Sequence, residues 1–294
     1  VPSSNTKLPH ILQTTGAVTK PNYANNRIGR LSDQDHVIGG LIVEIVNEEF
    51  FHIRQVQCND STGGFHDLNK YYRGDSVLDS RAVCAVLGDI HAGFEDETAI
   101  AAWKECIHLT NPEFIVLHDI CDAVSISHHA SNDIRQQVNR PPHMDTLEKE
   151  LNVVGETLLR WTQEFPKKKF IITYGNHDDA VVRYLKEGRY VWDRFNHRLS
   201  LKLAEWMLDG KNPIQQYVEE KFKIKNCVWL KGDDDFKFKG IQLGAHGHRG
   251  SNGTRGNISN LEESFGMCIL GHYHSPKILR DAWSVGTSTK LRIY

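Results

Sequence analysis

The sequence contains no apolar run that approaches the roughly 18 residues needed to cross a bilayer. Its first 20 residues also lack the apolar core of a signal peptide. These two absences predict a cytoplasmic protein with no membrane partner. The chain does not begin with Met and ends on a predicted strand, so we expect it to be processed or cut from a longer chain.

Cysteine is sparse, and the six cysteines are scattered singly with no C-x-x-C pair. This spacing excludes a zinc ribbon and a thioredoxin-like motif, and it indicates free thiols in a reducing compartment. The chain also has no large excess of positive or negative charge, because its net charge is only -2. A polyanionic substrate would therefore depend on bound metal ions for its positive field. Histidine, in contrast, is abundant, with 16 residues.

Two regions of different character make up the 294 residues. Residues 1–80 predict a small β-containing segment, with a hairpin formed by HVIGGLIVEIVN and EFFHIRQVQC and a loop over residues 59–76. Residues 81–294 predict the main domain. The N-terminal segment is compatible with an oligomerisation arm, a DNA-contacting element or a cap, and the sequence does not decide between them.

The first half of the main domain alternates strand and helix. Buried strands are predicted at 82–87, 113–117 and 169–174, and helices at 97–109, 145–165 and 200–210. Asp145 is the expected N-cap of the second helix, and Gly210 is expected to end the third. Short strands follow in quick succession at 226–232, 235–240, 241–245, 267–270 and 282–286. This order predicts an α/β fold of two packed mixed β-sheets flanked by helices.

Polar side chains that can bind metal follow five of the predicted strands. They are Asp89 and His91; His118 and Asp119; Asn176 and His177; His246 and His248; and His272 and His274. In α/β proteins the loops after strands build sites, so we expect these side chains to converge. The donors include no thiolate and are too many for one ion. Mixed carboxylate, amide and imidazole donors predict two divalent ions such as Mn²⁺, Fe²⁺ or Zn²⁺.

The series D-x-H, D-x-x-D, G-N-H-D, a histidine after a strand, and G-H-x-H resembles the calcineurin-like metallophosphoesterase superfamily over about residues 82–275. The resemblance implies a four-layer αββα sandwich and a two-metal phosphoesterase. One ion would be held by Asp89, His91, Asp119 and His274. The other would be held by Asp119, Asn176, His246 and His272. Asp119 would bridge the ions together with a water or hydroxide.

The resemblance also implies that His177 acts in catalysis, by donating a proton to the leaving oxygen or stabilising the charged phosphorane. Two departures from the family pattern stand out. His118 replaces the usual glycine before Asp119, and it could support the site, contact substrate or lie on the surface. His248 competes with His246 as a ligand, and we prefer His246 because it is nearer the strand end. Asp122 and Asp178 are expected to support their loops.

The sequence lacks the Asp-Arg-Gly run of the protein phosphatases in this superfamily, and this absence argues against a phosphoprotein substrate. Basic loop residues could instead reach a phosphate backbone: Arg135, Arg140, His143, Arg249 and Arg255, although the last two also fit a solvated loop. His128 and His129 could support the site, contact substrate or lie on the surface. Four segments, LPHILQTTGAVTKPNY, HVIGGLIVEI, FHIRQVQ and HGHRGSNG, further resemble a phage-type branch, the tailed-phage DNases that degrade host DNA. That resemblance implies a DNA substrate, Mn²⁺ or Mg²⁺, and the host cytoplasm.

Three alternatives stay open at this point. The same dinuclear site could serve a phosphatase or a small-nucleotide phosphodiesterase. A protein that keeps the fold and metals without the chemistry would be a binding protein. A homo-oligomer is also compatible with the sequence.

Overall fold

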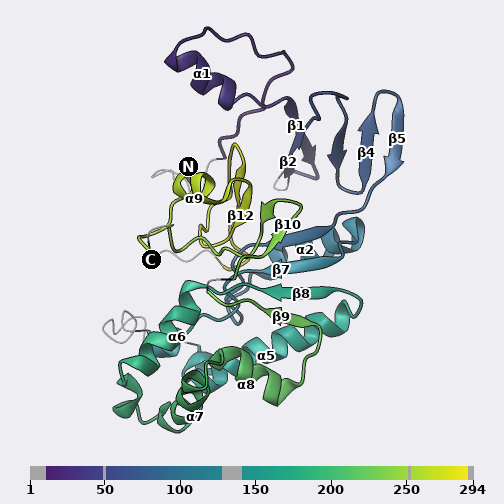
Figure 1. Ribbon diagram of the computed structural model, residues 1–294. Coiled ribbons are helices and arrows are strands. Elements are labelled where there is room, and N and C mark those ends of the chain that lie inside the picture. Colours follow the sequence, from purple (N-terminus) through teal and green to yellow (C-terminus); the bar gives the residue numbers. More distant parts are fainter. Residues whose placement is uncertain (1–10, 49–50, 128–140, 233, 251–252, 291–294) are drawn as a thin grey trace. The chain divides into compact units, whose positions relative to one another are not determined.

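The computed structural model describes residues 11–48, 51–127, 141–232, 234–250 and 253–290 (Figure 1). The chain divides into two compact units, Val1–Arg81 and Ala82–Tyr294. In these described ranges, none of the helices combines the length and apolar character required to span a membrane.

The N-terminal unit carries helix α1 (Arg27–Gln34), which Asn26 caps by accepting from the Gly29 backbone N–H. Strands β1 (Gly39–Ile45) and β2 (Phe51–Gln57) pair antiparallel, which confirms the predicted hairpin.

The loop predicted over residues 59–76 is wrong for 8 of its 18 residues, which lie in strands. It contains β3 (Phe65–Asp67) and β4 (Lys70–Arg73), which form an antiparallel sheet with β5 (Ser76–Asp79). The rings of the cross-strand partners Phe65 and Tyr72 stack with their centroids 5.0 Å apart. The glycines and polar residues that indicated a loop form the tight turns between these short strands, with Gly74 in the left-handed region.

The second unit is an α/β domain, as predicted, and its first sheet is parallel. Its strands are β6 (Cys84–Leu87), β7 (Phe114–Leu117), β8 (Lys169–Ile172) and β9 (Cys227–Trp229), in that spatial order. Every pairing between these strands is parallel, so the prediction that both sheets are mixed is wrong for this one. Parallel strands require crossover connections, and helices supply them here.

The helices of this unit are α2 (Glu97–Thr110), α5 (Leu147–Glu164), α6 (Asn176–Lys186), α7 (His197–Leu208) and α8 (Pro213–Phe222), with short 3₁₀ turns η1 (Val124–Ile126), η2 (Pro142–Met144) and η3 (Arg189–Val191). Thr146, and not the predicted Asp145, caps α5, because its side chain accepts from the Lys149 backbone N–H. Asp145 ends η2 instead and pairs with the Lys149 ammonium at 2.8 Å. Gly210 lies just past α7 with a positive φ, as expected at a helix end.

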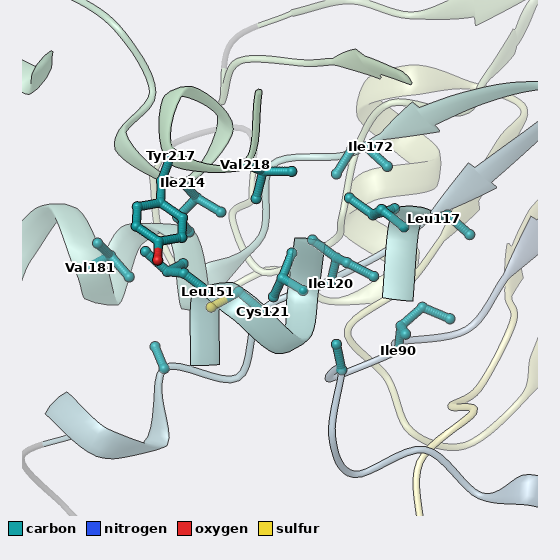
Figure 2. Close-up of a cluster of buried hydrophobic side chains, with 14 of the residues drawn as sticks. Ile90, Leu117, Ile120, Cys121, Leu151, Ile172, Val181, Ile214, Tyr217 and Val218 are labelled. Atoms are coloured by element: carbon teal, nitrogen blue, oxygen red, sulfur yellow. The ribbon is translucent and has the colours of Figure 1, made fainter. Parts of the chain in front are cut away.

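The parallel sheet is buried on both faces, and alternate residues of each strand face different cores. Ile115 and Leu117 of β7 lie in the larger cluster, which contains α5 and α8 residues such as Leu151 and Val218 (Figure 2). Phe114 and Val116 face a second cluster that includes Leu243 of the other sheet. This period of two explains why the strands read as unbroken apolar runs in the sequence.

The second sheet is mixed, in the order β10-β11-β12-β14-β13. Its strands are β10 (Lys237–Phe238), β11 (Ile241–Gln242), β12 (Cys268–Leu270), β13 (Lys277–Leu279) and β14 (Ala282–Ser284). Helix α9 (Ile258–Phe265) packs Ile258 and Leu261 against Cys268, Leu270 and Ala282. The three hydrophobic clusters therefore separate four layers: helices, parallel sheet, mixed sheet and α9. Strand β13 and helix α9 were not predicted.

Candidate metal centre

The polar residues singled out in the sequence follow strands of both sheets and converge on one site. Asp89 follows β6, Asp119 follows β7, and Asn176 begins α6 after β8. His246 follows β11, and His272 and His274 follow β12. The loops after β6 and β7 are held side by side, because the Ile90 and His91 backbone N–H groups donate to the carbonyls of His118 and Asp119.

Three of these residues have left-handed backbone conformations, which side chains other than glycine seldom adopt. The φ angles are 42° at His91, 45° at Asp119 and 66° at His272. A non-glycine residue held there costs on the order of 1 kcal/mol or more, and such residues cluster at functional sites. The sharp turns aim the side chains back across the strand ends.

Asp119 lies at the centre of the site and is only 1% exposed. Its Oδ2 atom is 3.3 Å from His246 Nε2, 3.6 Å from His177 Nε2 and 4.0 Å from His91 Nε2. Its Oδ1 atom accepts from the His177 backbone N–H at 3.4 Å. One carboxylate thus faces histidines from two loops and from the first turn of α6.

Asp89 is the second buried carboxylate of the site and is also 1% exposed. Its Oδ2 atom lies 3.3 Å from His274 Nε2, and its Oδ1 atom lies 3.9 Å from His246 Nδ1. The Oδ1 atom also accepts from the His272 backbone N–H at 2.9 Å. This bond ties the end of β6 in one sheet to the end of β12 in the other.

Asn176 contacts the imidazoles of His246 and His272. Its Oδ1 atom lies 2.9 Å from His246 Nε2 and 3.0 Å from His272 Nδ1. His246 Nε2 therefore faces both the Asn176 oxygen and the Asp119 carboxylate. Carboxylate, amide and imidazole donors therefore lie close together around His246 Nε2.

Two glycines make this close approach possible. A Cβ at Gly175 would lie 2.1 Å from Asp119 Oδ1, and a Cβ at Gly271 would lie 2.6 Å from Asp89 Oδ1. Each glycine thus sits against one of the two central carboxylates, and any side chain there would displace it.

The two carboxylates stay ionised although they are buried. Burial raises the pKa of Asp119, but the nearby imidazoles of His177 and His246 outweigh it and hold the pKa well below its usual value. Burial also opposes ionisation of Asp89, where the hydrogen bond from His274 and the charge of His246 lower the pKa. The site therefore presents two buried anions to a cation.

The imidazoles of His91 and His272 are neutral, as a metal ligand must be. Burial lowers the pKa of His91, and it lowers the pKa of His272 to about 4. His246 and His177 differ. Burial lowers the pKa of His246, but the charge of Asp119 and a hydrogen bond to that carboxylate prevail and raise it. The pKa of His177 is raised as well. Burial lowers its pKa, but the charges of Asp119 and Asp122 and a hydrogen bond to the Asp122 carbonyl prevail and raise it to about 9.

Two further observations indicate that the residues of the site fit a metal ion. Both ring nitrogens of His91 are buried without a hydrogen-bond partner among the described residues, although buried polar atoms are normally satisfied. Three sets of donors also have their ligand atoms within 4.8 Å of one another in the described part of the chain. They are Asp89, His91 and His274; His91, Asp119 and His177; and Asp89, Asp119 and His246. These groups can bind a metal ion.

The structure separates the two candidate histidines after β11. His246 is buried between Asp89 and Asp119, whereas His248 Nε2 lies 3.3 Å from Asp179 Oδ2. His246 is therefore the one placed among the other donors.

His118 is fully buried, so its interpretation as a surface residue is wrong. Its Nδ1 atom lies 2.9 Å from Thr173 Oγ1, which itself donates to the Leu117 carbonyl. Burial lowers the pKa of His118 to about 3, which keeps the ring neutral. It supports the ends of β7 and β8 behind the two carboxylates.

Asp178 holds its loop, as predicted, whereas the Asp122 side chain faces the site, with Oδ2 3.5 Å from His91 Nδ1. Asp178 Oδ2 accepts from the Gly175 backbone N–H at 2.9 Å, and the Asp122 carbonyl accepts from His177 Nδ1. Among the basic loop residues, Arg249 pairs with Asp179, and His143 lies on η2. His128, His129, Arg135 and Arg140 lie outside the described residues.

Sequence reasoning missed the parts played by Thr173, Asp179 and Glu150. Asp179 lies three residues after Asn176, so helical spacing could have placed both on one face of α6. Glu150 is buried on α5 and accepts from the backbone N–H groups of Val124 and Ser125, and no local signal in the sequence indicates this contact.

Comparison with known proteins gives one informative similarity. The chain is 27% identical over 310 aligned residues to a protein named Protein A1 from Escherichia phage T5. The alignment covers 99% of this chain and 55% of that protein, so the chain spans about half the length of the curated relative. No family model matches the chain, and no solved structure matches it. The similarity is consistent with the phage origin that the sequence resemblance implied.

Proposed function

We propose that this protein is a two-metal-dependent phosphodiesterase that hydrolyses DNA, with Mn²⁺ as the expected ion and Mg²⁺, Fe²⁺ or Zn²⁺ as substitutes. The observation that carries the proposal is the pair of buried, ionised carboxylates, Asp89 and Asp119, each facing imidazoles from separate strand ends. The layered α/β arrangement supports the proposed likeness to the metallophosphoesterase sandwich. Similarity to a phage protein supports the phage-type DNase, acting in the cytoplasm of an infected host.

Seven residues would hold the ions in this proposal. Asp89, His91, Asp119 and His274 would bind one, and Asp119, Asn176, His246 and His272 would bind the other. Bound there, a pair of divalent ions would supply Lewis-acid activation of the phosphodiester and of the attacking water. The roles of all other residues follow from their own contacts.

In this proposal His177 assists the chemistry directly. Its Nδ1 atom is bound to the Asp122 carbonyl, so its Nε2 atom faces Asp119 at 3.6 Å. Its raised pKa, about 9, keeps the ring protonated at neutral pH. A cationic ring in this position donates a hydrogen bond to a phosphoryl oxygen and can pass its proton to the leaving alkoxide.

The test is cleavage of supercoiled plasmid DNA by metal-stripped protein, with and without added Mn²⁺. We expect manganese-dependent cleavage that is lost in Asp119→Ala. Asp145→Ala removes a half-exposed carboxylate far from the site and serves as the matched control. Circular dichroism would show that both variants keep the fold.

Three results bear on the proposal. Normal cleavage by Asp119→Ala would overturn the assignment of the site. Hydrolysis of a small phosphate ester without DNA cleavage would replace the DNase with the phosphatase or small-nucleotide phosphodiesterase. Tight metal binding with no hydrolysis of any phosphoester would indicate a binding protein.

A further inference from the structure

A groove of about 450 Å³ opens beside the candidate metal centre. Asn176 and His272, two of the proposed ligands, form part of its lining. The groove continues away from them along α6 to Arg183, and across to the loop that carries Arg249 and Arg255. A substrate bound at the centre therefore has a path that leads directly into this groove.

The groove concentrates positive charge on a chain whose net charge is -2. Three arginines line it against a single carboxylate, Asp179. Burial raises the pKa of Asp179, but hydrogen bonds from His248, Arg249 and Tyr174 prevail and lower it to about 2. Asp179 is therefore ionised and pairs with Arg249. No carboxylate in the described part of the chain pairs with Arg183 or Arg255.

Backbone geometry places Arg249 and Arg255 directly opposite each other. They form an antiparallel bridge, closed by hydrogen bonds from the Gly256 N–H to the His248 carbonyl and from the Gly250 N–H to the Thr254 carbonyl. Like charges directly opposite on paired strands destabilise the pairing. Asp179 pairs with one of these two charges, that of Arg249, and no described carboxylate pairs with the other.

Arg183 completes the arrangement from another element. It lies on α6 seven residues after Asn176, which is two helical turns and about 10 Å along the axis on the same face. Its side chain is exposed. Two cations from separate elements thus flank a groove that begins at the candidate metal centre.

We propose that this groove binds the phosphodiester backbone of the DNA strand beside the bond that is cut, with Arg183 and Arg255 each contacting one phosphate. The inference rests on the proposed function and names the part of the substrate that the site holds. Backbone contacts of this kind fix the register of the strand and carry no sequence preference. They release counterions, so each one adds to the salt dependence of binding.

The experiment measures DNA binding without cleavage. Anisotropy of fluorescein-labelled single-stranded and duplex DNA of about 20 nucleotides is recorded with the full chain and Mn²⁺, from about 50 to about 200 mM KCl. The strands carry phosphorothioate linkages, which resist hydrolysis. We expect Arg183→Ala/Arg255→Ala to weaken binding equally for unrelated sequences. The slope of log K against log salt should fall in magnitude by about one for each arginine removed.

Two controls separate charge in the groove from general effects. Arg160→Ala removes an exposed arginine of α5 that does not line the groove, and it should leave the slope unchanged. Arg183→Lys/Arg255→Lys keeps both charges and should retain the wild-type slope. Equal slopes for wild type and the double alanine variant would overturn the proposal.

Failure of the groove assignment and failure of the proposed function would give different results. If wild type cleaves plasmid with Mn²⁺ while the double alanine variant keeps the wild-type slope, the groove assignment is wrong and the DNase stands. If wild type neither binds nor cleaves DNA with metal bound, the DNase itself is wrong and the groove assignment falls with it.

Discussion

The Nδ1 atom of His177 hydrogen-bonds to the backbone carbonyl of Asp122, and this bond sets which nitrogen the ring offers to the site. A carbonyl can only accept, so Nδ1 carries a proton and Nε2 faces Asp119. The Asp122 carbonyl belongs to the loop after β7, which also carries Asp119. One loop therefore supplies both the central carboxylate and the contact that orients the candidate acid.

Replacing His177 should separate catalysis from metal binding. We expect His177→Ala to lower kcat for DNA cleavage by about 10²–10⁴-fold, because that is the usual contribution of a positioned acid. The number of ions bound, measured by equilibrium dialysis and elemental analysis, should stay as in wild type. A variant that loses its ions would show instead that His177 is a ligand.

The two histidines after β11 should respond differently to the same substitution. His246→Ala removes a ring that lies between both carboxylates, so metal affinity should fall by more than the 10–100-fold typical of a supporting residue. His248→Ala breaks only the contact with Asp179 and should keep both ions. Titration calorimetry with Mn²⁺ on the two variants measures this directly, and equal losses would contradict the assignment.

Adding a single methyl group at Gly175 should disable the site. Its Cβ would lie 2.1 Å from Asp119 Oδ1, so the carboxylate must move. We expect Gly175→Ala to lower Mn²⁺ affinity and cleavage by at least about tenfold. Gly40→Ala is the matched control, because a Cβ there meets nothing within 4 Å. Wild-type activity of Gly175→Ala would show that the loop has room to adjust.

The stability of the domain should depend on the cluster between α5 and the parallel sheet. Leu151 is fully buried in it, beside Val218 and Ile214 of α8 (Figure 2). We expect Leu151→Ala to lower the free energy of unfolding by about 2–5 kcal/mol. Leu208→Ala, at a leucine that is 84% exposed, should change it by less than about 0.5 kcal/mol. Urea denaturation followed by circular dichroism gives both values.

Glu150 should make the folded state lose stability as pH rises. Burial raises its pKa from 4.5 to about 7, although hydrogen bonds from Ser125 and Val124 oppose the shift. Between these values the folded state holds a proton that the unfolded state has released. The stabilisation is therefore complete below about pH 4.5 and is lost as pH rises through about 7, by about 3 kcal/mol in all.

Substitution isolates this contribution from the other titrating groups. The drop in unfolding free energy between pH 5 and pH 8 should be larger for wild type than for Glu150→Gln, which cannot ionise. Identical drops in the two proteins would show that Glu150 has an ordinary pKa in the fold.

The donor residues could be predicted from sequence because they follow buried strands. A short apolar run such as residues 114–117, bounded by polar residues, favours a fully buried strand, and the polar residues that follow such a strand lie at the sheet edge. Convergence of Asp89, Asp119 and Asn176 then follows from parallel pairing. The crossover helices α2 and α5 were predictable for a similar reason, since their apolar residues recur at helical spacing.

Other features depend on contacts that local sequence does not encode. His246 and His248 both follow β11, and the backbone at Gly247, with a φ of 107°, turns their rings toward different partners. The strands β3 to β5 are three or four residues long, too short for a pattern to emerge above their turns. The pairing of Asp179 with Arg249 joins residues 70 positions apart.

The bond from the His272 backbone to Asp89 closes a loop of 183 residues. A ribosome adds about 5–20 residues each second, so the second half of the site is synthesised roughly 10–40 s after the first. During that interval the growing chain holds Asp89, His91 and then Asp119 without the imidazoles of His246, His272 and His274. The candidate metal centre therefore stays incomplete until His274 has been synthesised, and the proposed activity cannot begin before that point in translation.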